Sequence, residues 1–224
     1  MTFKHAILLI AVMLFSCTEV QRNNPCDENG TNYRGMNYRG CYSSEPPNIP
    51  SNIFTDSRDG KVYKFVQIGG QIWMAENLNY EASSSKCYDN SEGNCDKYGR
   101  LYNWTVAMTV CPTGWHIPSD EEWITLIDYV GGSSIAGARL KATKGWKSGN
   151  GQDTYGFTAL PGGDGDLADY FFNVGDNGAW WTATESNSNA SNASYRYMRY
   201  ISDEVYRKDS NKNNNLYSVR CVQD

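Results

Sequence analysis

Cysteine is the residue type in this chain whose spacing points most directly to a chemistry. The 224 residues include seven cysteines, at positions 17, 26, 41, 87, 95, 111 and 221. In an exported protein an odd count leaves one cysteine to be explained, and we assign that place to Cys17. Sequence proximity then favours the pairs Cys26 with Cys41, Cys87 with Cys95, and Cys111 with Cys221, although other pairings remain possible. A zinc site is the weaker interpretation, because C-x-x-C is absent and His5 and His116 are the only histidines.

Acidic side chains and histidine give little support for catalysis. A nucleophilic triad needs a base, and His116 lies ahead of a helix cap, where a structural histidine bonded to local backbone is the simpler interpretation. Two carboxylates could hydrolyse a glycosidic bond, and Asp164, Asp166 and Glu185 are candidates. Asp176 could join the two aspartates around a cation. We nevertheless expect no catalytic residue, no metal and no cofactor.

Binding is better supported, because aromatic side chains lie among amides and charges in the second half of the chain. Such mixtures suit carbohydrate or protein surfaces. We expect Trp180 and Trp181 to belong to the core, since adjacent strand residues point to opposite faces and at least one must face inward. The net charge of −5 and the absence of a basic cluster argue against nucleic acid as a partner. The candidate ligand-binding residues, all expected on exposed loops, are Tyr170, Asn173, Asp176, Tyr195, Arg196, Tyr206 and Asn211.

The N-terminal segment predicts export. Lys4 precedes an apolar run over residues 6–15 that is short for a permanent membrane helix. The run ends at Ser16-Cys17, which resembles a bacterial lipobox. Residues 1–16 are therefore expected to be a lipoprotein signal peptide and Cys17 the lipidated residue, with an ordinary secretory signal as the alternative. Residues 17–52 are expected to form the anchor, a tether and a small loop closed by Cys26 and Cys41.

The main domain is expected to span residues 53–224. Strict alternation predicts a strand over 61–68, Gly69-Gly70 predicts a hairpin turn, and residues 71–74 return as a second strand. A long loop up to about residue 99 should carry the small ring closed by Cys87 and Cys95. Helices are predicted over 102–110 and from Ser119, where Ser119 and Glu122 have the spacing of a capping box. A further helical turn is possible over 136–142.

Short aromatic strands separated by polar loops are predicted after residue 156. The expected strands are 157–160, 179–183, a hairpin of 195–201 with 204–208, and 216–222. The loops at 162–178, 184–194 and 209–215 are long and polar, and such loops are common places for binding residues. This order of elements favours an α+β fold with two main helices and a loop-rich second half.

Several sequence blocks resemble one known family. They are WMAENLNY, YGRLYNW, CPTGWHIPSDEEW, GFTALPGG, WWTATE and YSVRCV, in this order between residues 73 and 222. The series resembles the Fibrobacter succinogenes major paralogous domain, over roughly residues 53–224. The resemblance implies a C-type-lectin-like domain with paired terminal strands, in an exported or lipidated bacterial protein. The sugar-binding motifs of C-type lectins are absent, so neither a calcium site nor a monosaccharide site is carried over from that fold.

Together these observations predict a surface lipoprotein of the cell envelope, held at the outer membrane by a lipid anchor. Its expected function is non-catalytic binding of a polysaccharide or a partner protein. A structural component of the envelope or an adhesion protein is the first alternative. An enzyme of the formylglycine-generating or glycan-cleaving type is the second.

Overall fold

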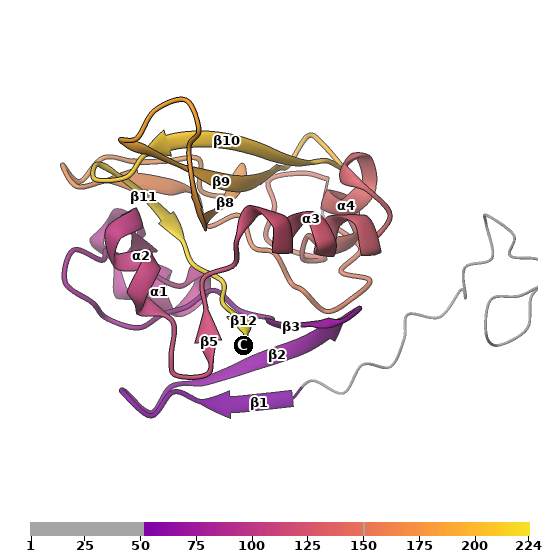
Figure 1. The fold of residues 1–224 in the computed structure, drawn as a ribbon, viewed down its shortest axis with the longest axis horizontal. Helices are drawn as coiled ribbons and strands as arrows, with labels where there is room; N and C mark the ends of the chain where they lie inside the picture. Colours follow the sequence, from indigo (N-terminus) through magenta and orange to yellow (C-terminus); the bar gives the residue numbers. More distant parts are fainter. Residues whose placement is uncertain (1–51, 150) are drawn as a thin grey trace, which may run out of the picture. The chain divides into compact units, whose positions relative to one another are not determined.

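The computed structural model describes residues 52–149 and 151–224 (Figure 1). The expected signal peptide, Cys17 and the Cys26–Cys41 loop lie outside the described residues. In chain order the elements are β1 (Asn52–Thr55), β2 (Val62–Ile68), β3 (Gln71–Met74), a short 3₁₀ helix (Tyr88–Asn90), α1 (Glu92–Tyr98), β4 (Leu101–Tyr102), α2 (Trp104–Val110), β5 (Trp115–His116), α3 (Asp120–Tyr129), α4 (Ser133–Leu140), β6 (Asp164–Asp166), β7 (Phe171–Phe172), β8 (Asn177–Glu185), β9 (Asn192–Arg199), β10 (Val205–Asn211), β11 (Asn215–Ser218) and β12 (Val222–Gln223).

The first sheet joins the two ends of the domain. Its five strands run in the order β1-β2-β3-β12-β5. The Gly69-Gly70 turn forms as predicted, with Ile68 opposite Gln71. The predicted N-terminal hairpin pairs with the last strand through β3 and β12, whereas β1, which was not predicted, lies at the edge of the sheet beside β2. The last strand inserts between β3 and β5, where Val222 lies opposite both Trp73 and His116.

The second sheet is built from the second half of the domain. Its order is β10-β9-β8-β11-β6-β7, and β4 pairs with β11 off this path. The predicted hairpin forms as β9 and β10, in register from Val205 opposite Met198 to Asn211 opposite Asn192. Much of the sequence expected as loop is therefore strand, since β6 and β7 lie within 162–178 and β10 extends to Asn211.

Four helices are present among the described residues, in place of the two main helices predicted. The predicted capping box at the start of α3 is confirmed. Ser119 Oγ accepts a hydrogen bond from the Glu122 backbone, and the Glu122 side chain accepts one from the Ser119 backbone. The segment after α3 forms the full helix α4. Gly137 in α4 allows close approach to the β9–β10 turn, because a Cβ there would lie 2.7 Å from the Asp203 carbonyl oxygen. Helix α1 occupies part of the loop expected before Gly99.

The strand predicted over 157–160 does not form. Thr158 has φ +53°, a left-handed conformation that a β-branched residue rarely adopts. The conformation is held by Asp153, which accepts hydrogen bonds from the Thr158 backbone at 2.7 Å and from its hydroxyl at 2.8 Å. Only Ala159 makes a bridge, to Lys141.

Two of the three expected disulfides lie in the described residues, and both form. Cys87 joins Cys95, and Cys111 joins Cys221 across a sequence separation of 110. The second bridge ties the end of α2 to the segment that connects β11 with β12. The chain between them is thereby one closed loop.

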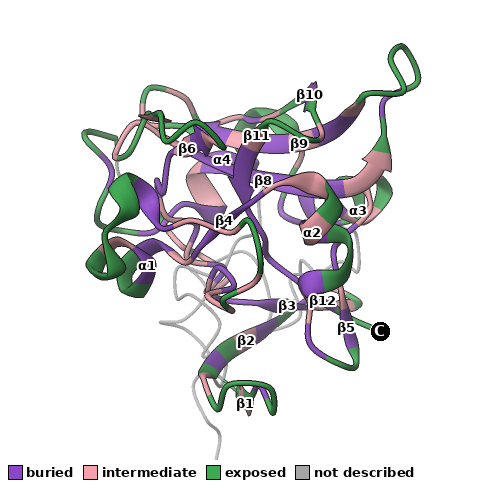
Figure 2. Ribbon diagram, turned by 90° about the vertical axis from the view of Figure 1, so that its left-hand side faces the viewer, coloured by how far each residue is buried: buried purple, intermediate pink, exposed green. Residues whose placement is uncertain are grey.

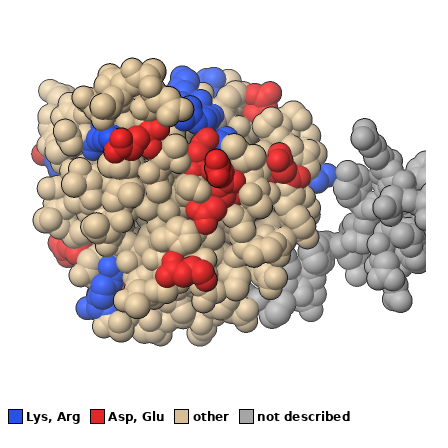
Figure 3. All heavy atoms as spheres, in the orientation of Figure 1, with Lys and Arg blue, Asp and Glu red and all other residues tan. Residues whose placement is uncertain are grey.

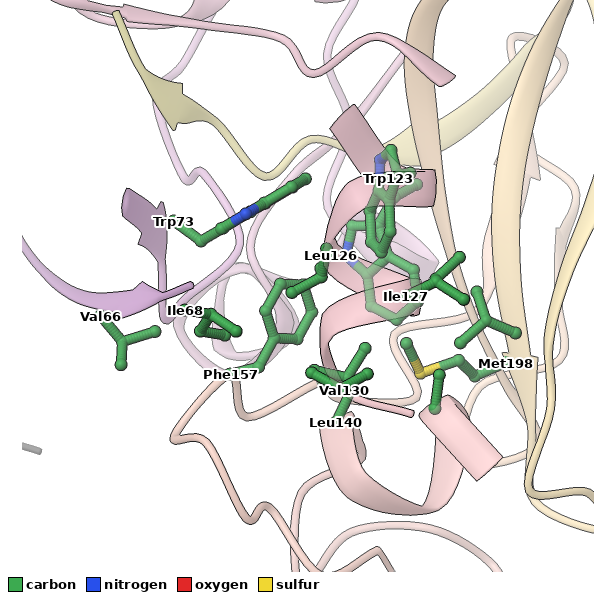
Figure 4. Close-up of a cluster of buried hydrophobic side chains, with 14 of the residues drawn as sticks. Val66, Ile68, Trp73, Trp123, Leu126, Ile127, Val130, Leu140, Phe157 and Met198 are labelled. Atoms are coloured by element: carbon green, nitrogen blue, oxygen red, sulfur yellow. The ribbon is translucent and has the colours of Figure 1, made fainter. Parts of the chain in front are cut away.

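The core lies on both sides of β8. Figure 1 shows α3 and α4 between the five-stranded sheet and the strands β8, β9 and β10. Trp123 of α3 packs there against Trp73 and Phe157, with ring centroids 5.1 and 5.8 Å apart (Figure 4). It also packs against Trp180 at 6.0 Å. Trp181 points to the other side and packs with Tyr217. Trp180 and Trp181 are fully buried, as predicted. Strand β8, which carries them, is buried along most of its length (Figure 2).

A buried arginine links these layers. The Arg220 guanidinium donates to Asn77 Oδ1 at 2.7 Å, to the Thr158 carbonyl at 3.2 Å and to the Phe157 carbonyl. Its cation also lies 4.3 Å from the Phe157 ring centroid. Burial lowers the pKa of Arg220 to about 9. We call Arg220, Asn77, Phe157, Thr158 and Trp180 the Arg220 core.

Candidate functional site

A pocket of about 390 Å³ opens on the face of β8, β9 and β10 that is turned away from α3. Strand register places its side chains there. Ala179 lies opposite Tyr197, which lies opposite Tyr206, and the next row contains Trp181, Tyr195 and Lys208. Residues on one face alternate along a strand. We call this site the tyrosine pocket; it is lined by Asp164, Asn173, Asn177, Ala179, Tyr195, Tyr197, Arg199, Lys208 and Tyr217.

Stacked tyrosines form one wall of the tyrosine pocket. The rings of Tyr195 and Tyr217 stack at 4.4 Å and 19°, and Tyr197 stacks on Tyr206 at 5.0 Å and 23°. Tyr195 and Tyr197 join the two stacks at 5.7 Å. Ala179 has no side chain beyond its methyl group, so the row that contains Tyr197 leaves space above β8. The result is an open aromatic surface on the second sheet.

Asp164 and Asn173 contribute polar groups from β6 and the loop after β7. Asn173 Nδ2 donates to Asp164 Oδ1 at 2.7 Å. The two residues meet because Gly163, at φ +71°, lets the chain pass close to the Phe172 carbonyl, where a Cβ would lie at 2.4 Å. Burial raises the pKa of the Asp164 carboxyl, and the hydrogen bond from Asn173 opposes that shift.

The hydroxyls of Tyr195 and Tyr217 remain protonated near neutral pH. Burial raises the pKa of Tyr195 well above its ordinary value, and the neighbouring Tyr217 adds to the shift. Burial likewise raises the pKa of Tyr217, whose hydroxyl lies 3.0 Å from Ser210 Oγ. A protonated phenol both donates and accepts hydrogen bonds. The pocket can therefore offer a ligand aromatic faces, amides, a carboxyl group and two cations.

The structure brings three of the seven predicted binding residues to the tyrosine pocket. Asn173 and Tyr195 line it, and Tyr206 supports it by stacking on Tyr197. Tyr170, Asp176 and Asn211 are not among the lining residues. Tyr170 is exposed before β7, Asp176 pairs with Lys147 at 3.4 Å, and Asn211 ends β10 and accepts hydrogen bonds from the following turn.

Arg196 was expected on an exposed loop, and that placement is wrong. It lies inside β9, is 6% exposed and points toward α3. There its Nε donates to Asp120 at 2.7 Å, and Asp120 also pairs with Arg207 at 3.0 Å. Arg196 thus fixes the helix to the sheet on the side opposite the pocket.

The residues that sequence reasoning missed are the strand neighbours of Arg196. Tyr197 and Arg199 share a face with Tyr195, and Lys208 lies opposite Tyr195 on β10. The period-two alternation of 195, 197 and 199 could have identified this face. The contributions of Asp164 and Tyr217 depend on sheet order, which no local signal gives.

Two of the three acidic candidates for catalysis, Asp166 and Glu185, are held in structural contacts. Asp166 Oδ1 accepts backbone hydrogen bonds from Ala168 and Tyr170, and Glu185 pairs with Lys212 at 2.8 Å.

The His116 side chain contacts two carboxylates, where bonding to local backbone was expected. Its Nε2 lies 2.8 Å from Glu122 and its Nδ1 lies 2.7 Å from Asp224.

One cluster of potential metal ligands occurs within residues 52–149 and 151–224. It consists of Cys87, Glu92 and Cys95. The two thiols form a disulfide, so they are not available as thiolate ligands. This donor set therefore does not fit a metal.

A second pocket, of about 340 Å³, lies between β2, α1 and the segment around Thr158. Its lysines are already engaged, since Lys61 pairs with Asp59 at 3.4 Å and Lys97 lies over the Tyr98 ring at 4.6 Å. Of its lining residues Tyr63 stacks on a neighbouring ring, that of Phe54, at 5.5 Å and 24°, and Phe54 does not line the pocket.

Figure 3 shows charged groups of both signs on one face of the domain. On the face drawn in Figure 3 acidic groups are dispersed, and no large basic patch is visible. This distribution agrees with the net charge of −5. In residues 52–149 and 151–224, no helix combines the length and the apolar character needed to cross a bilayer.

The fold and the site define an α+β domain with two disulfides and an open aromatic pocket on its second sheet. Comparison with known families then identifies it. The family described as Fibrobacter succinogenes major domain matches residues 66–223, and the chain belongs to that family. No curated protein and no solved structure matches the chain.

Proposed function

We propose that this protein is a non-catalytic binding module for a polysaccharide or a partner protein, and that its ligand occupies the tyrosine pocket. A polysaccharide is the favoured ligand. Pockets for small ligands have volumes of roughly 300–1,000 Å³ and combine apolar surface with a few placed polar groups. The pocket of about 390 Å³ is within this range, and it suits one or two sugar residues better than a folded partner.

The observation that carries this proposal is the aromatic surface of Tyr195 and Tyr197 bordered by hydrogen-bonding groups. The apolar faces of sugar rings pack on aromatic rings, while their hydroxyls need donors and acceptors. Asn173, Asn177 and Asp164 supply such groups within the same pocket. Tyr195, Tyr197 and Asn177 lie on strands joined by continuous register, so little ordering of these side chains would be needed on binding.

A C-type-lectin-like fold is part of the proposal. It is supported by the early β2–β3 hairpin, by the helices that follow, and by the return of the last strand into the first sheet. We also propose that the protein is an exported lipoprotein anchored at the outer membrane through Cys17. The apolar run before Cys17 supports that location, and mass spectrometry of the mature N-terminus tests it.

Binding to a glycan array tests the function. The wild-type protein should bind at least one polysaccharide, and Tyr206→Ala should reduce that binding because Tyr197 loses its stacking partner. Tyr129→Ala is the matched control, since Tyr129 is exposed on α3 and outside the pocket. Equal loss in both variants, or no glycan bound by wild type, would count against the pocket as a polysaccharide site.

A further inference from the structure

We infer that the tyrosine pocket recognises a carboxylate-bearing sugar, that is, a uronic acid residue of an acidic polysaccharide. The inference rests on the proposed binding function and names its ligand class. The two cations that line the pocket carry the inference. They lie beside the aromatic surface, and a sugar with a carboxylate group would supply the ion-pair partner that they lack.

Arg199 and Lys208 differ from the other cations of this sheet and its surroundings. Arg196 and Arg207 both pair with Asp120, and Lys212 pairs with Glu185. Arg199 and Lys208 form no ion pair within the described part of the chain, although the domain is acidic overall. Both side chains border the pocket, so an anionic ligand would supply the partner that the protein does not.

The two cations lie on either side of the row that contains Tyr197. Arg199 is opposite Asn177 in the row on one side, and Lys208 is opposite Tyr195 in the row on the other. The Lys208 ammonium leans toward the middle row and lies 5.4 Å from the Tyr197 ring centroid. A sugar ring on Tyr197 would therefore lie within reach of a positive charge at its edge.

Asp164 completes the recognition without cancelling this charge. Its carboxyl group is bonded to Asn173 and is half-buried, whereas both cations are exposed. An acceptor in that position can bind a sugar hydroxyl. The lining side chains include one acid and two cations, and this net positive charge favours a ligand that carries one negative charge.

A neutral sugar would occupy the same aromatic surface but would leave both cations without a partner. Covering a charge without compensation has a cost in desolvation, whereas a carboxylate forms charge-assisted hydrogen bonds with lysine and arginine. The pocket should therefore discriminate between a uronic acid and the corresponding neutral hexose.

The test is binding of the purified protein to polygalacturonate, alginate and hyaluronan, each compared with its carboxyl-reduced form. Reduction keeps the sugar ring and removes the charge. We expect at least one acidic polymer to bind about tenfold more tightly than its reduced form, the effect of one charged hydrogen bond. Lys208→Met and Arg199→Met should each remove most of that preference, and Asp164→Asn should strengthen it.

Lys144→Met is the control, because it changes the net charge equally at an exposed residue outside the pocket. It should leave the preference intact. Dextran sulfate, a neutral backbone with sulfate groups, separates carboxylate recognition from general attraction to anions. Binding of dextran sulfate with the same dependence on Lys208 would overturn the assignment of a carboxylated sugar.

The outcomes also separate this inference from the proposed function. Equal binding of acidic and reduced polymers, lost in Tyr206→Ala, would overturn the inference and leave the binding module in place. Absence of binding to every polymer, acidic or reduced, would contradict both. A preference for acidic polymers that survives in Lys208→Met and Arg199→Met would place the charge recognition outside this pocket.

Discussion

The Arg220 core and the tyrosine pocket both combine a cation with aromatic rings, yet they differ in what surrounds the charge. Arg220 is completely buried, and its donors are used by Asn77 and by two backbone carbonyls. Lys208 lies 5.4 Å from the Tyr197 ring and is exposed, with no acidic partner in the described residues. A buried cation whose hydrogen-bond donors are all used can only stabilise the fold. An exposed cation with unused donors can bind a ligand.

Stability and binding depend on different regions of the same domain. Trp180, in the Arg220 core, and Trp181, beside the pocket tyrosines, are neighbours in β8. One strand therefore carries the closed region on one face and supports the open region on the other. Substitutions in the closed region should change the free energy of unfolding, and those in the open region should change binding.

The largest effect is expected from the disulfide beside Arg220. Replacing Cys111 and Cys221 by serine opens a loop with a sequence separation of 110, which should cost about 4.8 kcal/mol in the chain-entropy estimate. Replacing Cys87 and Cys95, separated by 8 residues, should cost roughly 2.5 kcal/mol. Chemical denaturation under oxidising conditions measures both. Equal losses would show that loop length does not determine the stabilisation.

Arg220→Met should follow, with a loss of about 3 kcal/mol or more, because Asn77 Oδ1 and the carbonyls of Phe157 and Thr158 lose their donor while buried. Arg220→Lys keeps a positive charge but not the planar fork of donors. It should recover only part of the stability. Full recovery would show that the charge near Phe157 and Trp180 matters more than the hydrogen bonds. Neither variant should change ligand affinity once the protein is folded.

Local sequence signals were sufficient for the elements that depend on neighbours in the chain. Ser119 and Glu122 gave the start of α3, Gly69-Gly70 gave the first hairpin, and the alternation around residue 200 gave the second. The same reasoning failed at 157–160. Thr158 in that segment is held in a left-handed conformation by hydrogen bonds with Arg220 and Asp153, which both lie outside the segment. A strand does not contain that conformation.

The site was harder to predict than the fold for two physical reasons. A shift of one residue moves a strand side chain to the opposite face, and this shift separates the predicted Arg196 from Tyr197 and Arg199, which face the pocket. Asp164 reaches the pocket only because β6 pairs with β11 and β7 turns back beside it. That order of strands is set by packing across the whole second sheet, and the residues near Asp164 do not encode it.

Two lysine substitutions, one in each region, should differ in their effect on stability. Lys141 is 1% exposed and donates to the carbonyls of Gly149, Arg199 and Ser202 at 2.8 to 3.3 Å. Lys141→Met leaves these acceptors unpaired and should cost about 2 kcal/mol. Lys208→Met removes no such contact and should change the free energy of unfolding by less than about 0.5 kcal/mol. Similar losses in the two variants would break the distinction between closed and open regions.

His116 provides an intermediate case, since its side chain is 41% exposed and lies between Glu122 and Asp224. Burial lowers its pKa, but the hydrogen bonds that the ring donates to the two carboxylates together raise the pKa above the ordinary value near 6.5. A raised folded-state pKa contributes stability that is present below the unfolded pKa and is lost as pH rises through the folded value.

The His116→Gln variant should therefore be less stable than wild type below about pH 6.5, by less than about 1 kcal/mol because solvent screens the cluster. The difference should shrink as the pH rises above that value. Thermal unfolding of both proteins across this pH range measures it, with Lys144→Met as a surface control. A difference that stays constant with pH would show that His116 acts through packing against Glu122, and that its charge contributes nothing to the stability of the domain.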